Sequence, residues 1–284
     1  MGVLPVVPDS DRTSNHSRLR TLLLGKFSLG RMMRAVLFVY LAIGGYAFFF
    51  ADRQIFQPQP SSYQDDRTTI KLFSAPNVQL SAVYLPHPNA TYTVLYSHGN
   101  GEDLGDVRPL LAQIQAIGVN VFAYDYRGYG TSQGKSSEQT AYQDIDAAYS
   151  YLTTTLKQPP NRIILYGRSV GSGPSIDLAT RRPVAGLVVE SGFTSAFRVL
   201  TQIPLFPFDK FSNINKIGAV HCPLLFIHGT RDRTIPFQHG RTLFDRANQP
   251  KTFLVVDGAD HNDVQQIAGE RYNQALRTFI RSLD

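Results

Sequence analysis

Short apolar runs that alternate with longer helical stretches most restrict how this chain of 284 residues can fold. The runs are rich in β-branched or aromatic residues, and from the third onward they alternate with helical stretches such as 138–156, 237–247 and 264–283. Continuously apolar strands that alternate with helices predict a parallel sheet covered on both faces. The first two runs have no helix between them and predict an antiparallel start. The eight runs are 68–73, 80–85, 93–97, 120–124, 162–166, 186–189, 224–228 and 252–256.

The N-terminal part of the chain differs from the rest in charge and hydropathy. Residues 35–51 contain no charged side chain, and six Lys or Arg residues precede them in the stretch 1–34. A run of this length lies at the short end of the range that spans a bilayer, so we predict a transmembrane anchor at 35–51. The positive-inside rule then makes residues 1–34 a basic cytoplasmic tail and places the folded part on the extracytoplasmic side.

Three other interpretations of residues 35–51 stay open. A cleaved signal peptide would need a site with small residues after the apolar core, and the core ends in three phenylalanines at 48–50. A buried helix of a soluble domain would show a polar face, and none is visible. A segment that enters only one leaflet would leave the folded part in the cytoplasm. Beyond the anchor, we expect a Pro/Ser-rich linker at 52–66 and one catalytic domain at 67–284.

Charge and cysteine content exclude several classes of function. The formal net charge is +6, but residues 1–51 carry six basic and two acidic side chains, so the folded part is nearly neutral. Without a basic stripe on the folded part, we expect no nucleic-acid binding. Cys222 is the only cysteine, which rules out an intramolecular disulfide and a cysteine-based zinc site. Histidine-based metal motifs are also missing, so we expect no metal and no cofactor.

The strongest chemical signal is the pattern Gly-Arg-Ser-Val-Gly at residues 167–171, directly after an apolar strand. In this setting the serine sits on a sharp strand-to-helix turn that exposes its hydroxyl above the sheet. Side chains at the flanking glycines would collide with the neighbouring backbone. We therefore predict that Ser169 is a nucleophile, and the alternative is a glycine-rich turn without catalysis.

A nucleophilic serine needs a base and a carboxylate that orients the base. His261 follows the last strand, where a doubly wound sheet presents its site, and it completes the chain order Ser, Asp, His. Asp232 follows the strand at 224–229 and is the candidate carboxylate, because Asp257 and Asp260 share a loop with His261.

Two further parts of the site follow from loops at strand ends. A glycine-rich turn after the strand at 93–97 places the backbone N–H of Asn100 where, with that of Val170, it could form an oxyanion hole. In the same region Asp125 and His98 are expected to fix loops. The segment 191–217 is expected to form a short lid that is rich in apolar residues. Its aromatic residues either pack on the sheet or line a pocket for an acyl chain, and the candidates for such a pocket are Phe193, Phe197 and Phe206.

Motifs over nearly the whole domain carry a family resemblance. They include Ser-His-Gly-Asn at 97–100, Tyr-Asp-Tyr-Arg-Gly-Tyr-Gly at 124–130, Tyr-Gly-Arg-Ser-Val-Gly at 166–171 and Ile-His-Gly-Thr at 227–230. The chain resembles the membrane-associated α/β-hydrolase-domain serine hydrolases, nearest the protein-depalmitoylase group and the bud-emergence-type hydrolases with an N-terminal anchor. The other matching pieces are 103–105, Ser132, 134–135, Tyr142, 144–148, Asp232, 258–259 and 261–263.

The resemblance implies an α/β-hydrolase fold and a triad of Ser169, Asp232 and His261. The depalmitoylases of this group carry an acylated N-terminal cysteine cluster, whereas here no cysteine precedes Cys222. This difference puts a palmitoyl-protein substrate in doubt, although membrane attachment is expected by the apolar span.

Together these features predict a serine hydrolase that cleaves carboxylic esters or thioesters through an acyl-enzyme. Two alternatives remain. An aminopeptidase-like enzyme would need acidic residues for the substrate's amino group, and none is evident near the motifs. A membrane-tethered binding protein on the same fold, without catalysis, conflicts with the intact order of Ser, Asp and His.

Overall fold

A computed structural model describes residues 28–201 and 203–284. The chain divides into two compact units, Met1–Phe49 and Phe50–Asp284, which are described separately. Most of the predicted basic tail, residues 1–27, lies outside the described residues.

The first unit contains most of α2 (Leu29–Ile55), a helix of 27 residues that includes the predicted anchor. Such a helix is about 40 Å long, which exceeds the hydrocarbon core of about 30 Å in a typical bilayer. Large apolar side chains along it, such as Phe38 and Phe49, are exposed. Within the described part of the chain, α2 is the one helix that is long and apolar enough to cross a membrane.

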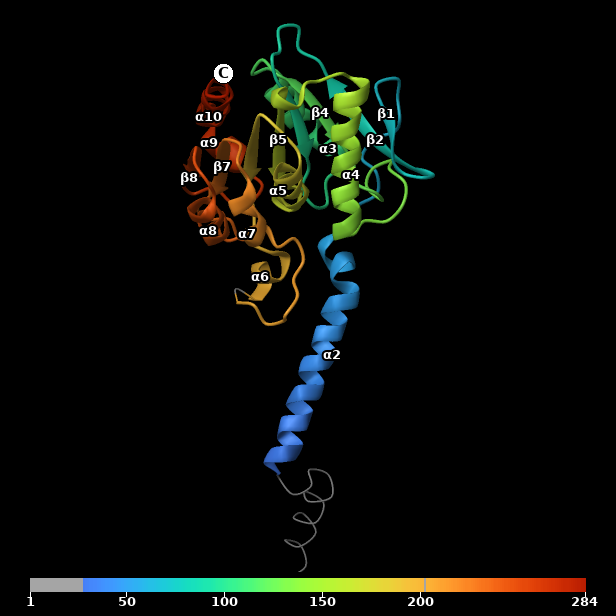
Figure 1. The fold of residues 1–284 in the computed structure, drawn as a ribbon, viewed down its shortest axis with the longest axis vertical. Coiled ribbons are helices and arrows are strands. Elements are labelled where there is room, and N and C mark those ends of the chain that lie inside the picture. The colour runs from blue at the N-terminus through green and yellow to red at the C-terminus, as the bar shows by residue number, and fades with distance from the viewer. Residues whose placement is uncertain (1–27, 202) are drawn as a thin grey trace, which may run out of the picture. The chain divides into compact units, whose positions relative to one another are not determined.

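The second unit is built on a sheet of eight strands in the order β1-β2-β4-β3-β5-β6-β7-β8 (Figure 1). Strand β2 runs antiparallel to both of its neighbours, β1 and β4, and all other pairs are parallel. The prediction of an antiparallel start followed by a parallel sheet is therefore confirmed. The strands are β1 (Ile70–Ala75), β2 (Val78–Leu85), β3 (Thr93–Ser97), β4 (Asn120–Tyr124), β5 (Ile163–Arg168), β6 (Gly186–Glu190), β7 (Leu224–Gly229) and β8 (Lys251–Val256).

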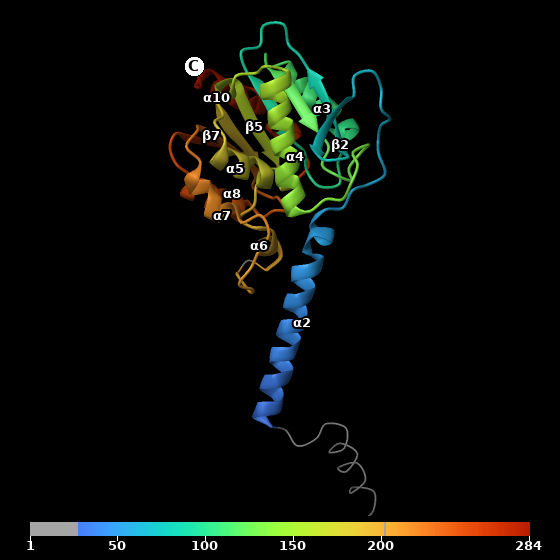
Figure 2. The same cartoon turned by 45° about the vertical axis from the view of Figure 1, so that its right-hand side comes forward.

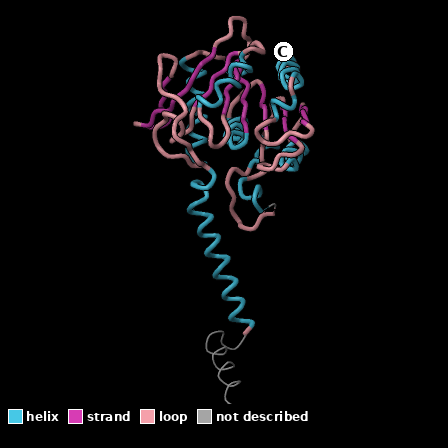
Figure 3. The backbone as a smooth tube through the Cα atoms, turned by 180° about the vertical axis from the view of Figure 1, so that it is seen from behind, coloured by secondary structure: helices cyan, strands magenta, loops and turns pink. Residues whose placement is uncertain are grey.

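Helices cover both faces of this sheet, as an oblique view and the view from behind show (Figures 2 and 3). One face packs against α3 (Leu104–Gln115), α9 (Val264–Ala268) and α10 (Glu270–Arg281), which supply apolar side chains to one buried cluster. The helices on the other face are α4 (Glu138–Ser150), α5 (Ser172–Arg181), α7 (Asn213–Lys216) and α8 (Phe237–Arg246). Because both faces are buried, every residue of β3, β4 and β6 is buried.

Short irregular elements complete the domain. A π-helical turn, η1 (Tyr151–Thr155), continues α4 to the end of the predicted helical stretch. The predicted C-terminal helix is interrupted at Gly269, whose φ of 55° is accessible to glycine at little cost. The remaining short helices are η2 (Pro160–Arg162), η3 (Ser169–Gly171), α6 (Ala196–Thr201) and η4 (Ile217–Ala219).

The segment predicted as a linker is packed against the domain. Phe56, directly after α2, is only 5% exposed and makes edge contacts with the rings of Tyr126, Tyr129 and Phe211 at centroid distances of 6.3, 6.5 and 5.9 Å. Tyr63 donates its hydroxyl to Asp125 Oδ2 at 2.5 Å. Residues 52–55 of the predicted linker belong to α2. The Pro/Ser composition of the rest does not reveal that single aromatic side chains hold this backbone against the domain.

Candidate active site

The turn after β5 holds Ser169 in a conformation that few non-glycine residues adopt. Its φ is 53°, in the left-handed region, as expected at a sharp strand-to-helix turn. A Cβ at Gly167 would lie 2.5 Å from the carbonyl oxygen of Gly171, and a Cβ at Gly171 would overlap the carbonyl oxygen of Ser97. The two glycines are therefore required by close backbone contacts, which is the reason that the pattern predicted.

Three of the predicted side chains form one hydrogen-bonded series. His261 Nε2 lies 3.0 Å from Ser169 Oγ, and His261 Nδ1 lies 2.8 Å from Asp232 Oδ2. All three residues are buried, with exposed fractions of 6–8%. They come from the carboxyl ends of β5, β7 and β8, which meet at one edge of the sheet. The arrangement has the geometry of a nucleophile, a general base and an orienting carboxylate.

The carboxylate of Asp232 is held in place by further donors. Its Oδ1 accepts hydrogen bonds from the backbone N–H groups of Thr234 at 2.9 Å and Ile235 at 2.7 Å. Burial opposes the charge on Asp232, but hydrogen bonds from His228, from His261 and from the backbone outweigh burial and hold the pKa of the carboxyl well below its usual value. The carboxylate is therefore ionised at neutral pH, as a group that stabilises an imidazolium must be.

His228, at the carboxyl end of β7, supports this loop. Its Nε2 lies 2.8 Å from the carbonyl oxygen of Ile235 and 3.4 Å from Asp232 Oδ2. A Cβ at Gly240 would collide with the His228 ring. The histidine thus fixes the turn between β7 and α8 that carries Asp232.

The loop after β3, residues 98–102, is called the oxyanion loop below. The carbonyl of Ser97, the last residue of β3, and that of His98 lie against the nucleophile turn (residues 167–171), because they are the groups that a Cβ at Gly171 would meet. The side chain of Asn100 is anchored by two donors to its Oδ1, the backbone N–H of Gln57 at 2.9 Å and the hydroxyl of Tyr129 at 2.5 Å. The N–H groups of Asn100 and Val170 stay the candidate oxyanion donors.

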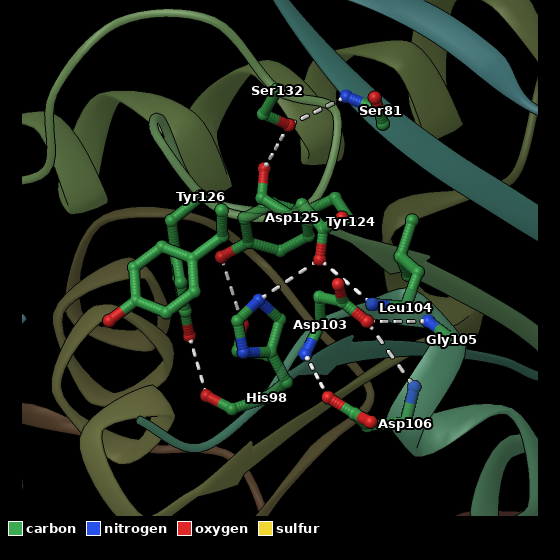
Figure 4. Close-up of polar contacts among 12 residues, drawn as sticks. Ser81, His98, Asp103, Leu104, Gly105, Asp106, Tyr124, Asp125, Tyr126 and Ser132 are labelled. Atoms are coloured by element: carbon green, nitrogen blue, oxygen red, sulfur yellow. Dashed lines mark hydrogen bonds and ion pairs between the residues drawn. The ribbon is translucent and has the colours of Figure 1, made fainter. Parts of the chain in front are cut away.

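A buried polar network contacts the first residue of the oxyanion loop, His98 (Figure 4). His98 Nε2 lies 3.3 Å from Asp125 Oδ1, which also accepts the backbone N–H of Leu104 at 3.0 Å. The hydroxyl of Tyr126 donates to the carbonyl oxygen of His98 at 3.0 Å. Asp103 caps α3 through a reciprocal capping box with Asp106. Asp125 and His98 therefore have the loop-fixing roles that the sequence predicted.

The three aromatic residues predicted for an acyl pocket do not form one group. Phe193 is 4% exposed and packs against the ring of Phe211 at 6.2 Å in the buried core. Phe197 instead contacts Phe206 at 6.4 Å and Phe208 at 5.9 Å, in the segment that contains α6. The acyl pocket stays a prediction for Phe193, Phe197 and Phe206, and Phe193 also packs in the buried core.

An open cavity of about 550 Å³ adjoins the candidate base. Polar residues line this cavity, and they are Arg233, Thr234, Asp260, His261, Asn262 and Asp263. The carboxylate of Asp260 is already occupied, since it accepts the side chain and backbone N–H of Arg233 and the backbone N–H of His261. Among the described residues, no group of three or more His, Cys, Asp or Glu side chains could hold a metal ion.

The sequence motifs do not predict a role for Arg168, Glu102 or Glu190. Arg168 forms ion pairs with Glu102 of the oxyanion loop and, at 3.5 Å, with Glu190. One signal was present, because Arg168 and Glu190 are charged residues at the ends of two apolar strands, and they are direct neighbours in the β5–β6 register.

Comparison with known proteins identifies the family. The chain is 44% identical to alpha/beta hydrolase domain-containing protein 17B of Xenopus tropicalis over 196 residues, which are 68% of this chain and 67% of the relative. The human protein 17B is 43% identical with the same coverage. The chain belongs to the alpha/beta hydrolase domain-containing protein 17 family. It is therefore an α/β serine hydrolase, and the serine hydrolase predicted from its motifs is confirmed.

Two broader similarities agree with this assignment. Residues 88–206 match the family model described as serine aminopeptidase, S33. The fold is similar to that of the Pyrococcus furiosus esterase Pf2001, with a TM-score of 0.66 and 21% identity over 80% of this chain and 98% of that chain. The Paleococcus ferrophilus monoacylglycerol lipase is similar over 72% of this chain and 99% of that chain, with a TM-score of 0.59 and 22% identity. At these identities the solved structures support the fold alone.

Proposed function

We propose that this serine hydrolase is anchored in a membrane and cleaves carboxylic esters or thioesters with Ser169 as nucleophile, His261 as base and Asp232 as orienting carboxylate. One observation carries the proposal: the continuous series of contacts from Asp232 through His261 to Ser169, at 2.8 and 3.0 Å. Nucleophile and base lie within hydrogen-bonding reach, and the base is held by a third group, which is the arrangement that activates a serine.

The reaction follows from this geometry. Ser169 Oγ attacks the carbonyl carbon while its proton passes to His261 Nε2. The carbonyl oxygen becomes an oxyanion that accepts hydrogen bonds from the backbone N–H groups of Asn100 and Val170. The imidazolium returns the proton to the departing alcohol or thiol, which leaves an acyl-enzyme. Water then attacks the acyl carbonyl while its proton passes to His261 Nε2. The imidazolium returns that proton to Ser169 Oγ as the acyl–oxygen bond breaks, which releases the acid and restores Ser169 and His261.

Hydrolysis of p-nitrophenyl esters of increasing chain length, and of matched acyl thioesters, tests this proposal. Wild-type protein is expected to hydrolyse both classes, and Ser169→Ala is expected to lose the activity. Ser169→Ala that retains wild-type rates would contradict the proposed nucleophile. Ser172→Ala is a matched control, because the Ser172 hydroxyl donates to the Ser169 carbonyl oxygen at 2.7 Å but has no contact with His261.

An aminopeptidase-like activity is the second candidate, and the description of the matched family model favours it. An aminopeptidase needs a free carboxylate near the scissile bond for the substrate's amino group. The cavity beside His261 offers Asp260, but Arg233 and two backbone N–H groups already engage it. We therefore expect faster turnover of p-nitrophenyl esters than of aminoacyl anilides, and the reverse preference would favour the peptidase.

The anchor proposed for α2 has its own test. The basic residues ahead of the apolar stretch favour a cytoplasmic N-terminus and an extracytoplasmic domain. In intact membranes, protease added from the cytoplasmic side is then expected to leave the domain uncut, and protease added after permeabilisation to digest it. Extraction of the protein by alkaline carbonate without detergent would contradict a spanning helix.

A further inference from the structure

The side chain of Arg168 joins three separate parts of the site. Its guanidinium forms an ion pair with Glu102 of the oxyanion loop. On the opposite side, Nη2 donates to Asn262 Oδ1 at 2.9 Å and to the backbone carbonyl of His261 at 3.3 Å. Arg168 directly precedes Ser169, so one side chain bridges the nucleophile turn, the oxyanion loop and the loop that carries the base (residues 257–263, the base loop).

The buried carboxylate of Glu190 holds the guanidinium of Arg168 in place. Glu190 is 3% exposed, and its Oε1 lies 3.5 Å from Arg168 Nε. The other oxygen, Oε2, accepts the hydroxyls of Tyr166 and, at 2.7 Å, Tyr272. Burial raises the pKa of both tyrosines well above the usual value, so both remain protonated donors. Arg168 is thus anchored to β6 and α10, rather than free to follow either loop.

The chemistry of arginine suits this position. A guanidinium offers five N–H donors in a rigid plane and stays charged, so it can contact three partners in different directions at fixed angles. The side chain of Arg168 is 11% exposed, which limits screening of its ion pairs by water. A lysine would keep the charge but has a compact ammonium group that cannot reach both loops at once.

We propose that Arg168 is a positioning residue that fixes where the oxyanion loop and the base loop lie relative to Ser169. This proposal rests on the function proposed above. Through Glu102 it holds the loop that presents the N–H of Asn100, and through Asn262 and the His261 carbonyl it holds the backbone that carries the imidazole. Arg168 does not touch the reacting atoms. Its effect is on the distances among nucleophile, base and oxyanion donors, and catalysis is sensitive to errors of about 1 Å in these distances.

The test compares Arg168→Lys with wild type on a p-nitrophenyl ester. Arg168→Lys keeps a cation beside Glu190, so the thermal midpoint is expected to stay close to wild type. We expect kcat to fall about ten- to a hundredfold while KM is unchanged, because transition-state geometry rather than substrate binding is affected. Arg241→Lys on α8 is the matched control, since it pairs with Asp245 at 3.1 Å on the surface, and its kcat is expected to equal that of wild type.

Two further variants separate the two arms. Glu102→Gln weakens the contact to the oxyanion loop, and Asn262→Ala removes the contact to the base loop. As a single substitution, each is expected to lower kcat. Combined with Arg168→Lys, each is expected to lower kcat little further, because the shared contact is already lost. Fully additive losses, or wild-type kcat in Arg168→Lys, would overturn the inference.

Ser169→Ala separates a failure of the positioning role of Arg168 from a failure of the proposed function. If Ser169→Ala is inactive and Arg168→Lys is fully active, only the positioning role of Arg168 fails. If Ser169→Ala hydrolyses the ester at the wild-type rate, the proposed nucleophile itself fails.

Discussion

Asp232 Oδ2 accepts a hydrogen bond from His261 Nδ1 at 2.8 Å, which turns the opposite nitrogen of the ring toward Ser169. This contact fixes the tautomer that a general base needs. The carboxylate is also held by two backbone N–H groups, so the imidazole is oriented by a rigid partner.

Replacement of this carboxylate should therefore impair catalysis far more than folding. Asp232→Asn preserves the shape of the side chain but removes the charge and favours the wrong tautomer, so kcat is expected to fall about ten-thousandfold. Steady-state hydrolysis of a p-nitrophenyl ester measures this fall in kcat. Asp257→Asn is the matched control, because Asp257 is an exposed neighbour of the base that accepts only the hydroxyl of Thr230, at 2.9 Å. A similar loss in both variants would contradict the assignment.

The lowered pKa of Asp232 also predicts how stability depends on pH. Its pKa is lower in the folded than in the unfolded chain, so the folded state binds fewer protons. The carboxylate thus stabilises the fold at neutral pH, and this contribution is lost as the pH falls below about 4. Urea unfolding of wild type and Asp232→Asn should show a difference in unfolding free energy at neutral pH that narrows in acid. A difference independent of pH would show that the charge of Asp232 does not stabilise the fold.

The nucleophile turn should tolerate no side chain at Gly171. Gly171→Ala would drive a Cβ into the carbonyl oxygen of Ser97, so the turn and the oxyanion loop must separate. We expect a loss of about 1–3 kcal/mol in unfolding free energy and a lower kcat. Gly218→Ala is the control, because the nearest atom to its Cβ, the carbonyl oxygen of Arg246, is 3.9 Å away. Equal stability of the two variants in urea unfolding would contradict the close packing of the turn.

The network beneath the oxyanion loop should contribute to stability as well as activity. Asp125 is fully buried, and Asp125→Ala would remove the acceptor of the Leu104 N–H and the Tyr63 hydroxyl. Each orphaned donor costs about 1–3 kcal/mol, which chemical denaturation would measure. The partly exposed carboxylate of Asp146 pairs with Arg181 at 2.9 Å, and its loss should cost at most about 1 kcal/mol. If Asp125→Ala and Asp146→Ala have the same unfolding free energy, the network does not support the fold.

The sequence predicts the fold, and the structure brings the three candidate triad residues together, for one physical reason. Ser169, Asp232 and His261 each follow a recognisable apolar strand, and the carboxyl ends of parallel strands converge on one edge of a sheet. The contacts of Arg168 could not be predicted in this way, because they depend on how three loops approach one another. Phe56 was missed for a similar reason, since a short segment rich in Pro and Ser gives no periodicity from which burial can be inferred.

Locating the covalent adduct of a fluorophosphonate shows whether Ser169 is the nucleophile of this hydrolase. Trypsin cleaves after Arg168, so the candidate nucleophile begins the peptide 169–181, which also contains Ser172 and Ser175 as internal controls. Fragmentation by mass spectrometry distinguishes the three serines. We expect one adduct, on Ser169, and none in Ser169→Ala. An unlabelled wild-type protein, or an adduct on another residue that persists in Ser169→Ala, would contradict this expectation.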